Sequence, residues 1–434
     1  MDVKKIGVLG MGYVGLTLSI VLAERGFDVE GHDINEPLKE RLRKGEPHFF
    51  ERKLERHLKN ALESGKLKIV SQINDCDAYM ICVASPLDSC KRPSTKAIES
   101  ATRELLPHLN NNPLIIVRST VPVGVTRNKV LQILESEGKK CGKDFSLVFA
   151  PERTLEGNAI QELYRNPQII GGFDEQSALR ASSLFRMLTP VIINVSSLEA
   201  AEAAKLLDNT SRDFNFGFSN LFAHFCEDNK LDAHEIIKAT NAFYPRNNIP
   251  VPSPGVGGVC LTKDPRLFVS SSPNTEGLNT IIAVREANER YPRRMLERIK
   301  QKLKENGKYL KDSQFFITGF SYKGEPETDD IRDSTTILFL NELKEYSSNI
   351  KAYDPLVKPE VLSSLGVQVV DSYEKGLENS DCALFMNNHH SYQELDIVHL
   401  SSKMNKPAII FDAWRVLDQR VRKSDNIHYM SVGL

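Results

Sequence analysis

The chain has 434 residues, of which 41% are hydrophobic and 26% charged, and its formal net charge at pH 7 is −1. A chain of this length is expected to form two or three domains, and without an excess of basic residues it is not expected to bind nucleic acid. No apolar run reaches the roughly 20 residues that span a bilayer, and no secretory hydrophobic segment precedes the first strand, so neither a membrane protein nor an exported one is expected.

Seven cysteines are scattered along the chain without the spacing of a disulfide framework or a zinc site. This pattern favours a reducing, cytoplasmic setting, in which most thiols are small buried side chains. Cys260 differs from the others because it lies in the glycine-rich stretch "PSPGVGGVCLTKD" (252–264). We expect this stretch to be a pliant loop, in which a thiol is poorly packed.

Residues 1–197 alternate short apolar strands with helices. The first strand spans 6–9, a helix follows and ends at Gly26, and the second strand spans 29–33. Four more apolar segments, "AYMICVA", "LIIVRST", "FSLVFAPE" and "QIIGG", are expected to be strands. This order predicts an α/β domain with a doubly wound parallel sheet that is covered by helices on both faces.

The turn between the first strand and the first helix carries a dinucleotide-binding fingerprint. Gly10, Gly12 and Gly15 satisfy GxGxxG, and Asp33 follows at the end of the second strand. The glycines permit a tight turn, close approach to a pyrophosphate and close helix–strand packing, while the helix N-terminus offers N–H groups to the phosphates. Asp33 would bind the ribose hydroxyls and repel a 2′-phosphate, which favours NAD over NADP. The alternative is a plain structural turn with a solvated carboxylate.

Residues 198–305 show an almost purely helical pattern and are expected to form a middle domain. One long helix is expected from 198 to a break near "NKLD", and another from about 279 to 304. The alternation of strand and helix returns in 306–434, where "SQFFITGF", "NIKAYD", "GVQVVDS", "DCALFMN" and "PAIIFDA" are the expected strands. The chain is therefore predicted to hold two Rossmann-like domains joined by a helical domain with a long central helix.

Ten short blocks occur in an order that resembles the nucleotide-sugar 6-dehydrogenases, the family that includes UDP-glucose and UDP-N-acetylmannosamine dehydrogenases. The blocks are "GMGYVGL", "GEPHFFE", "VASPLD", "RSTVPVG", "APERTLEG", "AAKLLDNTSRDFNFGFSN", "PSPGVGGVCLTKD", "GFSYKGEPETDDIRDS", "YDP" and "DAWRVLD". The resemblance runs from Gly7 to about Asp418. It implies an NAD-binding domain (1–197), a helical domain for dimerisation with the cysteine loop (198–305) and a UDP-binding domain (306–434).

The resemblance also implies the reaction. The 6-hydroxyl of a UDP-sugar is oxidised twice to a carboxylate, with two NAD and one water consumed. An aldehyde gives up a hydride readily only after a nucleophile has added to it. Cys260 stands at the family's nucleophile position, where its thiolate would form a thiohemiacetal and then a thioester that water hydrolyses. The alternative for Cys260 is a small buried residue.

By resemblance, three groups of residues form the site, and no metal is needed. The residues implied in catalysis are Cys260, Lys205, Asn209, Asp264, Glu152 and Thr120. Those implied in NAD binding are Gly10, Gly12, Tyr13, Val14, Gly15, Asp33, Ser85, Pro86, Ser119, Thr120 and Arg332. Those implied in UDP-sugar binding are Glu152, Arg153, Lys205, Asn209, Arg246, Gly257, Lys323 and Arg415. Arg246 matches an arginine that in relatives reaches the sugar of a neighbouring subunit.

Several of these roles have structural alternatives. Lys205 and Asn209 share one helix face at i, i+4 and would stabilise the reacting oxygen, or they are a surface lysine and a helical asparagine. Asp264 either orients Lys205 or accepts a proton during hydrolysis. Glu152 and Thr120 either position the attacking water or cap local structure. A further pair, the histidines at 389 and 390, is expected to be a polar loop rather than a pair of metal ligands.

Different motifs favour different sugars as the substrate. "APER" and "PRNNIPVPSPGVGG" are similar to the N-acetylhexosamine branch, whereas the Lys-Asp of "CLTKD" is similar to the glucose branch. We favour a UDP-N-acetylhexosamine, either UDP-N-acetylmannosamine or UDP-N-acetylglucosamine, with UDP-glucose as the alternative. A single-step hydroxyacid dehydrogenase and a non-catalytic NAD-binding scaffold are the competing functions.

Family members are usually dimers or larger, and the long middle helix offers an apolar stripe for such an interface. Its members are Leu206, Phe214, Phe218 and Phe222. The stripe would alternatively be part of the internal core.

Overall fold

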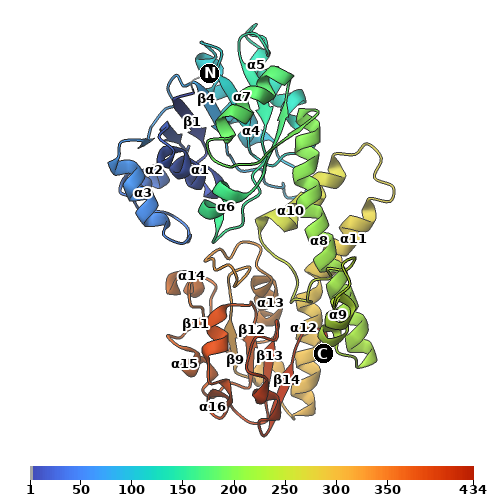
Figure 1. Ribbon diagram of the computed structural model, residues 1–434. Coiled ribbons are helices and arrows are strands. Elements are labelled where there is room, and N and C mark those ends of the chain that lie inside the picture. Colours follow the sequence, from blue (N-terminus) through green and yellow to red (C-terminus); the bar gives the residue numbers. More distant parts are fainter. Residues whose placement is uncertain (1–2) are drawn as a thin grey trace. The chain divides into compact units, whose positions relative to one another are not determined.

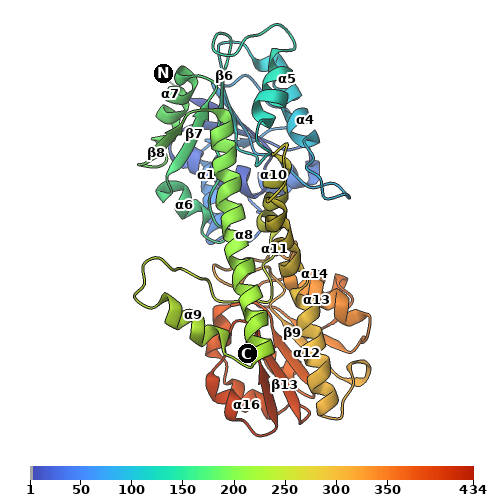
Figure 2. The ribbon, with the colours of Figure 1, turned by 90° about the vertical axis from the view of Figure 1, so that its right-hand side faces the viewer.

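The computed structural model describes residues 3–434, shown in Figure 1, and the chain forms two compact units. The first comprises residues up to Asn209 together with Lys263–Glu276, and the second comprises Thr210–Thr262 and Gly277–Leu434. Two helices contain residues of both units, α8 (Leu198–Asn229) and α10 (Val259–Ser270). α8 is one continuous helix of 32 residues (Figure 2). The predicted fold class is confirmed: two α/β sheets, with helical sequence and a long helix between them.

The first unit contains an eight-stranded sheet in the order β3-β2-β1-β4-β5-β6-β7-β8. Its strands are β1 (Lys5–Leu9), β2 (Asp28–His32), β3 (Leu67–Ile69), β4 (Ala78–Ile81), β5 (Leu114–Val117), β6 (Ser146–Phe149), β7 (Gln168–Gly172) and β8 (Ile192–Val195). Its helices are α1 (Tyr13–Glu24), α2 (Glu36–Arg43), α3 (Leu54–Glu63), α4 (Lys96–Glu104), α5 (Gln132–Glu135), α6 (Ala159–Arg165) and α7 (Glu175–Phe185). The strand order reverses between β1 and β4, which is where this class of sheet binds its ligand.

Alternate residues of the central strands fill two separate cores, one on each face of this sheet. In β4, Ala78 and Met80 join the apolar cluster formed with α1, α3, α6 and α7. Tyr79 and Ile81 of the same strand join the opposite cluster, which includes α4 and the start of α8. The period of two along each strand therefore explains why these segments are apolar throughout: both faces are covered by helices.

The sheet was predicted to be parallel throughout, and this is wrong for one pair of strands, since β7 pairs with β6 in antiparallel orientation. The connection between them stays at the carboxyl edge of the sheet, where the backbone N–H of Gly157 donates to the hydroxyl of Tyr13 at the start of α1 (2.9 Å). The chain therefore enters β7 from the edge at which it left β6.

The second unit contains a six-stranded parallel sheet in the order β11-β10-β9-β12-β13-β14. Its strands are β9 (Phe315–Thr318), β10 (Ile350–Tyr353), β11 (Gln368–Val369), β12 (Cys382–Phe385), β13 (Ala408–Asp412) and β14 (Ile427–Met430). Its other helices are α9 (Ala233–Asn241), α11 (Asn279–Glu289), α12 (Tyr291–Glu305), α13 (Thr335–Lys344), α14 (Pro359–Ser364), α15 (Tyr373–Leu377) and α16 (Ile397–Ser401). One face packs against α12, α13 and α8, and the other against α15 and α16. Its strand order reverses between β9 and β12.

The boundaries of several elements differ from the prediction. The segment at 252–264 is a loop only as far as Gly258, since α10 begins at Val259 and contains Cys260, so a loop was wrong for the last part of this stretch. The helix expected over 279–304 is two helices, α11 and α12, which meet at Arg290. Three strands, β3, β8 and β14, were not predicted, and all three lie at sheet edges.

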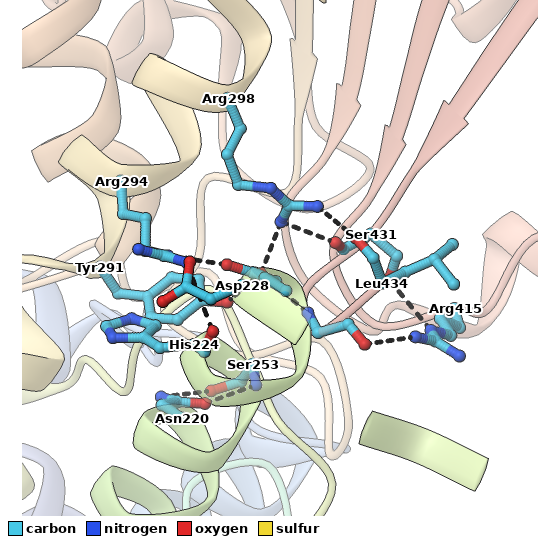
Figure 3. Close-up of polar contacts among 12 residues, drawn as sticks. Asn220, His224, Asp228, Ser253, Tyr291, Arg294, Arg298, Arg415, Ser431 and Leu434 are labelled. Atoms are coloured by element: carbon cyan, nitrogen blue, oxygen red, sulfur yellow. Dashed lines mark hydrogen bonds and ion pairs between the residues drawn. The ribbon is translucent and has the colours of Figure 1, made fainter. Parts of the chain in front are cut away.

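A polar cluster ties the end of α8 to α12 and to the last residues of the chain (Figure 3). The carboxylate of Glu227 accepts hydrogen bonds from Tyr291, Arg294 and Arg298. Arg298 also donates to the carbonyl oxygens of Ser431 and Leu434. Because Glu227 is buried and shared by two guanidinium groups, the cluster fixes α8 against the second sheet of its own unit.

Among residues 3–434 there is no helix with both the length and the apolar character needed to cross a membrane.

Candidate active site

The glycines of the fingerprint have distinct structural roles in the first unit. Gly10 has a φ of +91°, and a Cβ on Gly15 would collide with the carbonyl oxygen of Gly10. The turn therefore needs glycine at both positions. A Cβ on Gly12 would meet nothing within 4 Å, so this residue, which caps α1, faces open space. That is the position at which a pyrophosphate needs the backbone exposed.

Asp33 lies directly after β2 and holds the glycine turn. One carboxylate oxygen accepts a hydrogen bond from the backbone N–H of Met11 (2.8 Å), and the other accepts one from Asn35 (2.9 Å). Each oxygen keeps lone pairs that can accept further bonds. The carboxylate therefore lies at the edge of the fingerprint turn, with acceptor capacity left for the two ribose hydroxyls of NAD.

The loops after β4 and β5 complete this edge of the first sheet. The Ser119 hydroxyl donates to the carbonyl oxygen of Val83 (2.7 Å), which ties the loop containing Ser85 and Pro86 to the loop containing Thr120. The predicted NAD residues thus gather in the first unit, with one exception. Arg332 belongs to the second unit, where its guanidinium forms an ion pair with Asp330 (2.6 Å).

Glu152 is held by a cation that the sequence analysis did not identify. Its carboxylate forms an ion pair with the fully buried guanidinium of Arg118 and accepts hydrogen bonds from the backbone N–H groups of Arg153 (2.7 Å) and Thr154 (2.8 Å). Burial penalises the charged form, but Arg118 and the two N–H groups outweigh this penalty and lower the pKa of Glu152 below its ordinary value. Gln168 also accepts a hydrogen bond from Arg118 (3.1 Å). Glu152 is therefore a fixed, ionised carboxylate.

Lys205, Asn209 and Asp264 are all buried in the first unit, so the alternative of a surface lysine is wrong. Lys205 is 8% exposed and Asp264 is 0% exposed. The side-chain amide of Asn209 donates to Asp264 (2.5 Å), whose other oxygen pairs with Lys263. The observed partners of Asp264 are thus Asn209 and Lys263. One amide N–H of Asn209 is committed to Asp264, and the second can donate elsewhere.

The loop before Cys260 is held by buried polar side chains of the second unit. Asn220 accepts from the backbone N–H of Ser253 (2.8 Å), and Asn288 accepts from that of Val256 (3.3 Å). Arg285 donates to the carbonyl oxygen of Val256 (2.9 Å) while its guanidinium is paired with buried Asp213. Although the loop is rich in glycine, these hydrogen bonds hold its backbone in place, because the buried side chains of Asn220, Asn288 and Arg285 would lose their partners if the loop moved.

Cys260 is exposed, as the sequence analysis expected, but it is the second residue of a helix. A Cβ on Gly257 would collide with the backbone of Asp333, and Gly258 has a φ of +84°. Both glycines are therefore required for the chain to enter α10 in this way. Asp264 follows Cys260 by four residues in the same helix.

The remaining predicted UDP-sugar residues lie in the second unit. Lys323 is in the loop after β9, with its ammonium group 5.6 Å from the centre of the Tyr322 ring. Arg246 is exposed and donates to the hydroxyl of Tyr244 (3.2 Å). Arg415 is bound by both carboxylate oxygens of Asp232 (2.6 and 2.7 Å). Contact of these three residues with a UDP-sugar stays a prediction.

The sequence analysis missed the groups that position these residues. Arg118 immediately precedes Ser119, and a charged residue at the end of the buried segment "LIIVRST" was the available signal. The carboxylate of Glu51, in the block "GEPHFFE", contacts the Tyr13 hydroxyl and accepts from Gly157 (2.8 Å). No local signal marks the Arg285–Asp213 pair, since its members are far apart in the chain.

Comparison with known proteins gives consistent matches over nearly the whole chain. Residues 4–189, 199–290 and 316–419 match the NAD binding, central and UDP binding domains of the UDP-glucose/GDP-mannose dehydrogenase family. The chain is 33% identical over 410 residues to UDP-N-acetyl-D-mannosamine dehydrogenase of Pyrococcus horikoshii, with 94% of each chain covered. It is 32% identical to the enzyme of that name from Methanocaldococcus jannaschii, with 99% of this chain and 96% of the relative covered. A solved structure of UDP-D-ManNAc dehydrogenase from Pyrococcus horikoshii superposes with a TM-score of 0.90 at 31% identity, with 99% of each chain covered.

Replacing Arg118 by Leu should destabilise the protein, because it leaves the largely buried carboxylate of Glu152, whose side chain is 11% exposed, without its cation. We expect the free energy of unfolding at pH 7, measured by urea titration with circular dichroism, to fall by about 3–5 kcal/mol. Arg118→Leu combined with Glu152→Gln should recover part of this loss. The exposed pair Arg92–Asp88 supplies the control, since Arg92→Ala should change stability by less than about 1 kcal/mol.

The pH dependence of stability follows from the lowered pKa of Glu152. In the unaltered protein its stabilising contribution is present above the ordinary carboxyl range and is lost as the pH falls through the lowered pKa. In the Arg118→Leu protein the main cause of the lowered pKa is gone, so this contribution should be absent above the ordinary carboxyl range. The difference in stability between the variant and the parent should therefore shrink as the pH falls and Glu152 is protonated in both. If Arg118→Leu and Arg92→Ala were equally stable from neutral pH down through the carboxyl range, Arg118 would not be the group that keeps Glu152 ionised.

Proposed function

The chain belongs to the UDP-glucose/GDP-mannose dehydrogenase family, and we propose that it oxidises the 6-hydroxyl of a UDP-N-acetylhexosamine to a carboxylate. It is an NAD-dependent oxidoreductase of the nucleotide-sugar dehydrogenase type. The observation that carries the proposed chemistry is the buried group of Lys205, Asn209 and Asp264, which lies in the unit that also contains the NAD fingerprint. Buried polar and charged groups are costly to fold unless each is hydrogen-bonded or paired, and clusters of them are characteristic of functional sites.

NAD, held by the fingerprint turn and Asp33, supplies a hydride acceptor for each of the two oxidation steps. In the first step we propose that Lys205 and the second amide N–H of Asn209 face the reacting oxygen. The positive charge of Lys205 and the amide dipole of Asn209 would stabilise the alkoxide that forms when the 6-hydroxyl proton passes to a water molecule, before the hydride leaves C6. Asp264, which holds the first amide N–H of Asn209, acts in this scheme as a positioning residue that fixes the direction of the second.

In the second step the proposed nucleophile is the thiolate of Cys260. It adds to the aldehyde carbon, and the resulting thiohemiacetal loses a hydride to give a thioester. Water then attacks the thioester carbonyl carbon, the C–S bond breaks, and the carboxylate product and the thiolate are released. Glu152 is suited to orient or deprotonate this water, because Arg118 keeps it ionised and fixes its position.

The N-acetylated sugar is favoured over glucose by two arguments. The blocks "APER" and "PRNNIPVPSPGVGG" are similar to the N-acetylhexosamine branch. The relatives at 33% and 32% identity are both named for UDP-N-acetyl-D-mannosamine. We therefore propose UDP-N-acetylmannosamine as the substrate, with UDP-N-acetylglucosamine next and UDP-glucose as the alternative suggested by "CLTKD".

NADH formation against three substrates tests this choice. We expect saturable turnover with UDP-N-acetylmannosamine and a kcat/KM at least about 100-fold lower with UDP-glucose. The reason is that protein groups placed to hydrogen-bond the acetamido group of the sugar would lose their partners when a hydroxyl takes its place. Saturation by UDP-glucose alone would contradict the choice of sugar. Two NADH per uronate are expected, whereas one per product would indicate the hydroxyacid type. No turnover with any of the three would favour the non-catalytic scaffold.

Replacing Cys260 by Ser tests the nucleophile. The variant should bind the UDP-sugar with little change in affinity while uronate formation falls by at least about 1,000-fold, because a hydroxyl is a far weaker nucleophile than a thiolate at neutral pH. Calorimetric binding and product analysis measure the two effects separately. Cys90→Ser is the matched control, because Cys90 is also exposed. The Cys90→Ser enzyme should retain full activity. Full uronate formation by Cys260→Ser would remove the thiol from the mechanism.

We also propose a homodimer in which α8 contributes to the interface. Part of the predicted stripe is internal, since Leu206 is fully buried and Phe222 packs against the core of the second unit. Phe218 of the predicted stripe is exposed, and with Leu221 and Phe225 it forms an exposed apolar group of α8 in this unit, spaced for one helix face.

Charge on this face should dissociate the proposed dimer. Phe218→Asp combined with Phe225→Asp is expected to shift sedimentation from the dimer to the monomer, whereas Tyr309→Asp, a change at another exposed aromatic residue, should leave it unaltered. A monomeric parent protein, or a dimer that survives the double change, would contradict the interface.

Two broader expectations complete the proposal. A cytoplasmic setting is supported by the scattered cysteines, which lack disulfide spacing. A role in polysaccharide synthesis is supported by the chemistry of the product, an acidic sugar that is still activated on UDP for glycosyl transfer.

A further inference from the structure

The loops that follow β9 and β12 in the second unit bring Glu327, His389 and His390 together. These loops flank the point where the order of the second sheet reverses. From the sequence the two histidines, which follow a predicted strand, were expected to be a polar loop, and Glu327 is remote from them in the chain. In the fold, the three donor atoms lie within 4.8 Å of one another.

The separations between donor atoms match those around a tetrahedral metal ion. Oε1 of Glu327 lies 3.3 Å from Nε2 of His389 and 3.2 Å from Nδ1 of His390. Zinc takes imidazole nitrogen and carboxylate oxygen at about 2.0–2.2 Å, which places tetrahedral neighbours roughly 3.3–3.5 Å apart. Two of the three edges therefore already have the required length.

His389 presents an unsatisfied nitrogen to this cluster. The residue is 4% exposed, and its Nε2 makes no hydrogen bond of good geometry among the described residues, although the carboxylate of Glu327 lies 3.3 Å from it. Its Nδ1 lies 2.8 Å from the hydroxyl of Ser391, which in turn contacts the hydroxyl of Tyr373 (2.7 Å). When Nδ1 carries the hydrogen and donates to Ser391, the lone pair of Nε2 is directed at Glu327. Metal-bound histidines are typically oriented by such a bond from the other ring nitrogen.

The other tautomer gives a competing arrangement without metal. The backbone N–H of Ser391 lies 3.2 Å from Nδ1 of His389 and would donate to it, and Nε2–H would then face Glu327. The cluster would be an ordinary pairing of histidine and carboxylate. Metal titration distinguishes the two arrangements.

The two loops are fixed against each other by contacts other than the cluster. Backbone N–H groups of Gly324 (2.9 Å) and Glu325 (3.2 Å) donate to the side-chain oxygen of Asn388. A Cβ on Gly324 would collide with the backbone of His389, so glycine is needed for this close approach. The donor atoms are thus held in place by the fold, which reduces the cost of ordering them around an ion.

We propose that Glu327, His389 and His390 bind a divalent transition-metal ion of the zinc class, with solvent in the remaining position. Two imidazoles and one carboxylate suit Zn²⁺, Co²⁺ or Ni²⁺ rather than the all-oxygen shells of Mg²⁺ and Ca²⁺. The ion cross-links the loop that carries Lys323 to the loop after β12. Because it binds the folded chain in preference to the unfolded one, it raises thermal stability by an amount that grows with the logarithm of the free metal concentration above Kd. The site does not depend on the proposed dehydrogenase reaction.

Titration of the chelator-treated full-length protein with CoCl₂ tests the site. We expect one equivalent to bind with the intense visible absorption of tetrahedral Co²⁺, without the charge-transfer band of thiolate ligands. Added ZnCl₂ should displace the bound Co²⁺, which abolishes this absorption, and should raise the Tm of the protein. His390→Ala and Glu327→Gln should weaken binding by at least about tenfold, since loss of even a supporting group costs that much. His399→Ala is the matched control, because His399 is an exposed histidine of the same unit.

His390 is half exposed, so its replacement should leave the fold intact, and circular dichroism of both variants checks this. Binding by His390→Ala and Glu327→Gln as tight as by the parent and by His399→Ala would overturn the proposal. An octahedral cobalt spectrum, a thiolate band or no saturable binding would overturn it equally.

Discussion

The hydrogen bond from Asn209 to Asp264 is the interaction on which the account depends. Both side chains are buried, and an amide and a carboxylate are costly to bury unless each has a partner. The bond fixes the orientation of the Asn209 amide and leaves one N–H to donate. It also joins the middle of α8, which carries Lys205, to α10, in which Cys260 is the second residue. The two groups assigned to oxygen stabilisation therefore stand on one helix, α8, and the carboxylate that positions one of them stands on a second helix, α10.

Arg118 imposes a second constraint of the same kind on the carboxyl edge of the first sheet. It holds Glu152 ionised in a buried position, so the fold supports a charge that burial alone would neutralise. The connection that contains Glu152 remains at this edge, anchored by Gly157 to Tyr13 and Glu51. Because the connection stays at this edge, β7 runs antiparallel to β6. The NAD fingerprint and Glu152 share one edge because each follows the carboxyl end of a strand, and β1 and β6 run in the same direction in the sheet.

The parts of the structure that could be predicted are those that local sequence determines. The apolar strands, the glycine turn with Asp33 and the 32-residue helix each have a signal within a few residues, and all three predictions are confirmed. The edge strands β3, β8 and β14 were missed because each has only three or four residues, and those of β3 and β8 include exposed ones, so none forms a continuous apolar segment. The start of α10 was missed because three glycines and Pro265 masked a helical pattern that begins right after Gly258.

The site was harder to predict where it depends on distant residues. Cys260, Lys205, Asn209 and Asp264 were identified through family blocks, and their roles stay predictions. Arg118 beside Glu152, Asp213 beside Arg285 and Glu327 beside the two histidines became visible only once the chain was folded, since a buried charge specifies that it has a partner but not which one.

The most direct test of the central claim is mass spectrometry of the enzyme quenched during turnover with NAD and UDP-N-acetylmannosamine. Glu152→Gln should slow hydrolysis of the thioester and let it accumulate. The account predicts an acyl adduct of the sugar nucleotide on the peptide that contains Cys260, and its disappearance with further incubation. Uronate formation without any adduct on Cys260, or with an adduct on another residue, would contradict it.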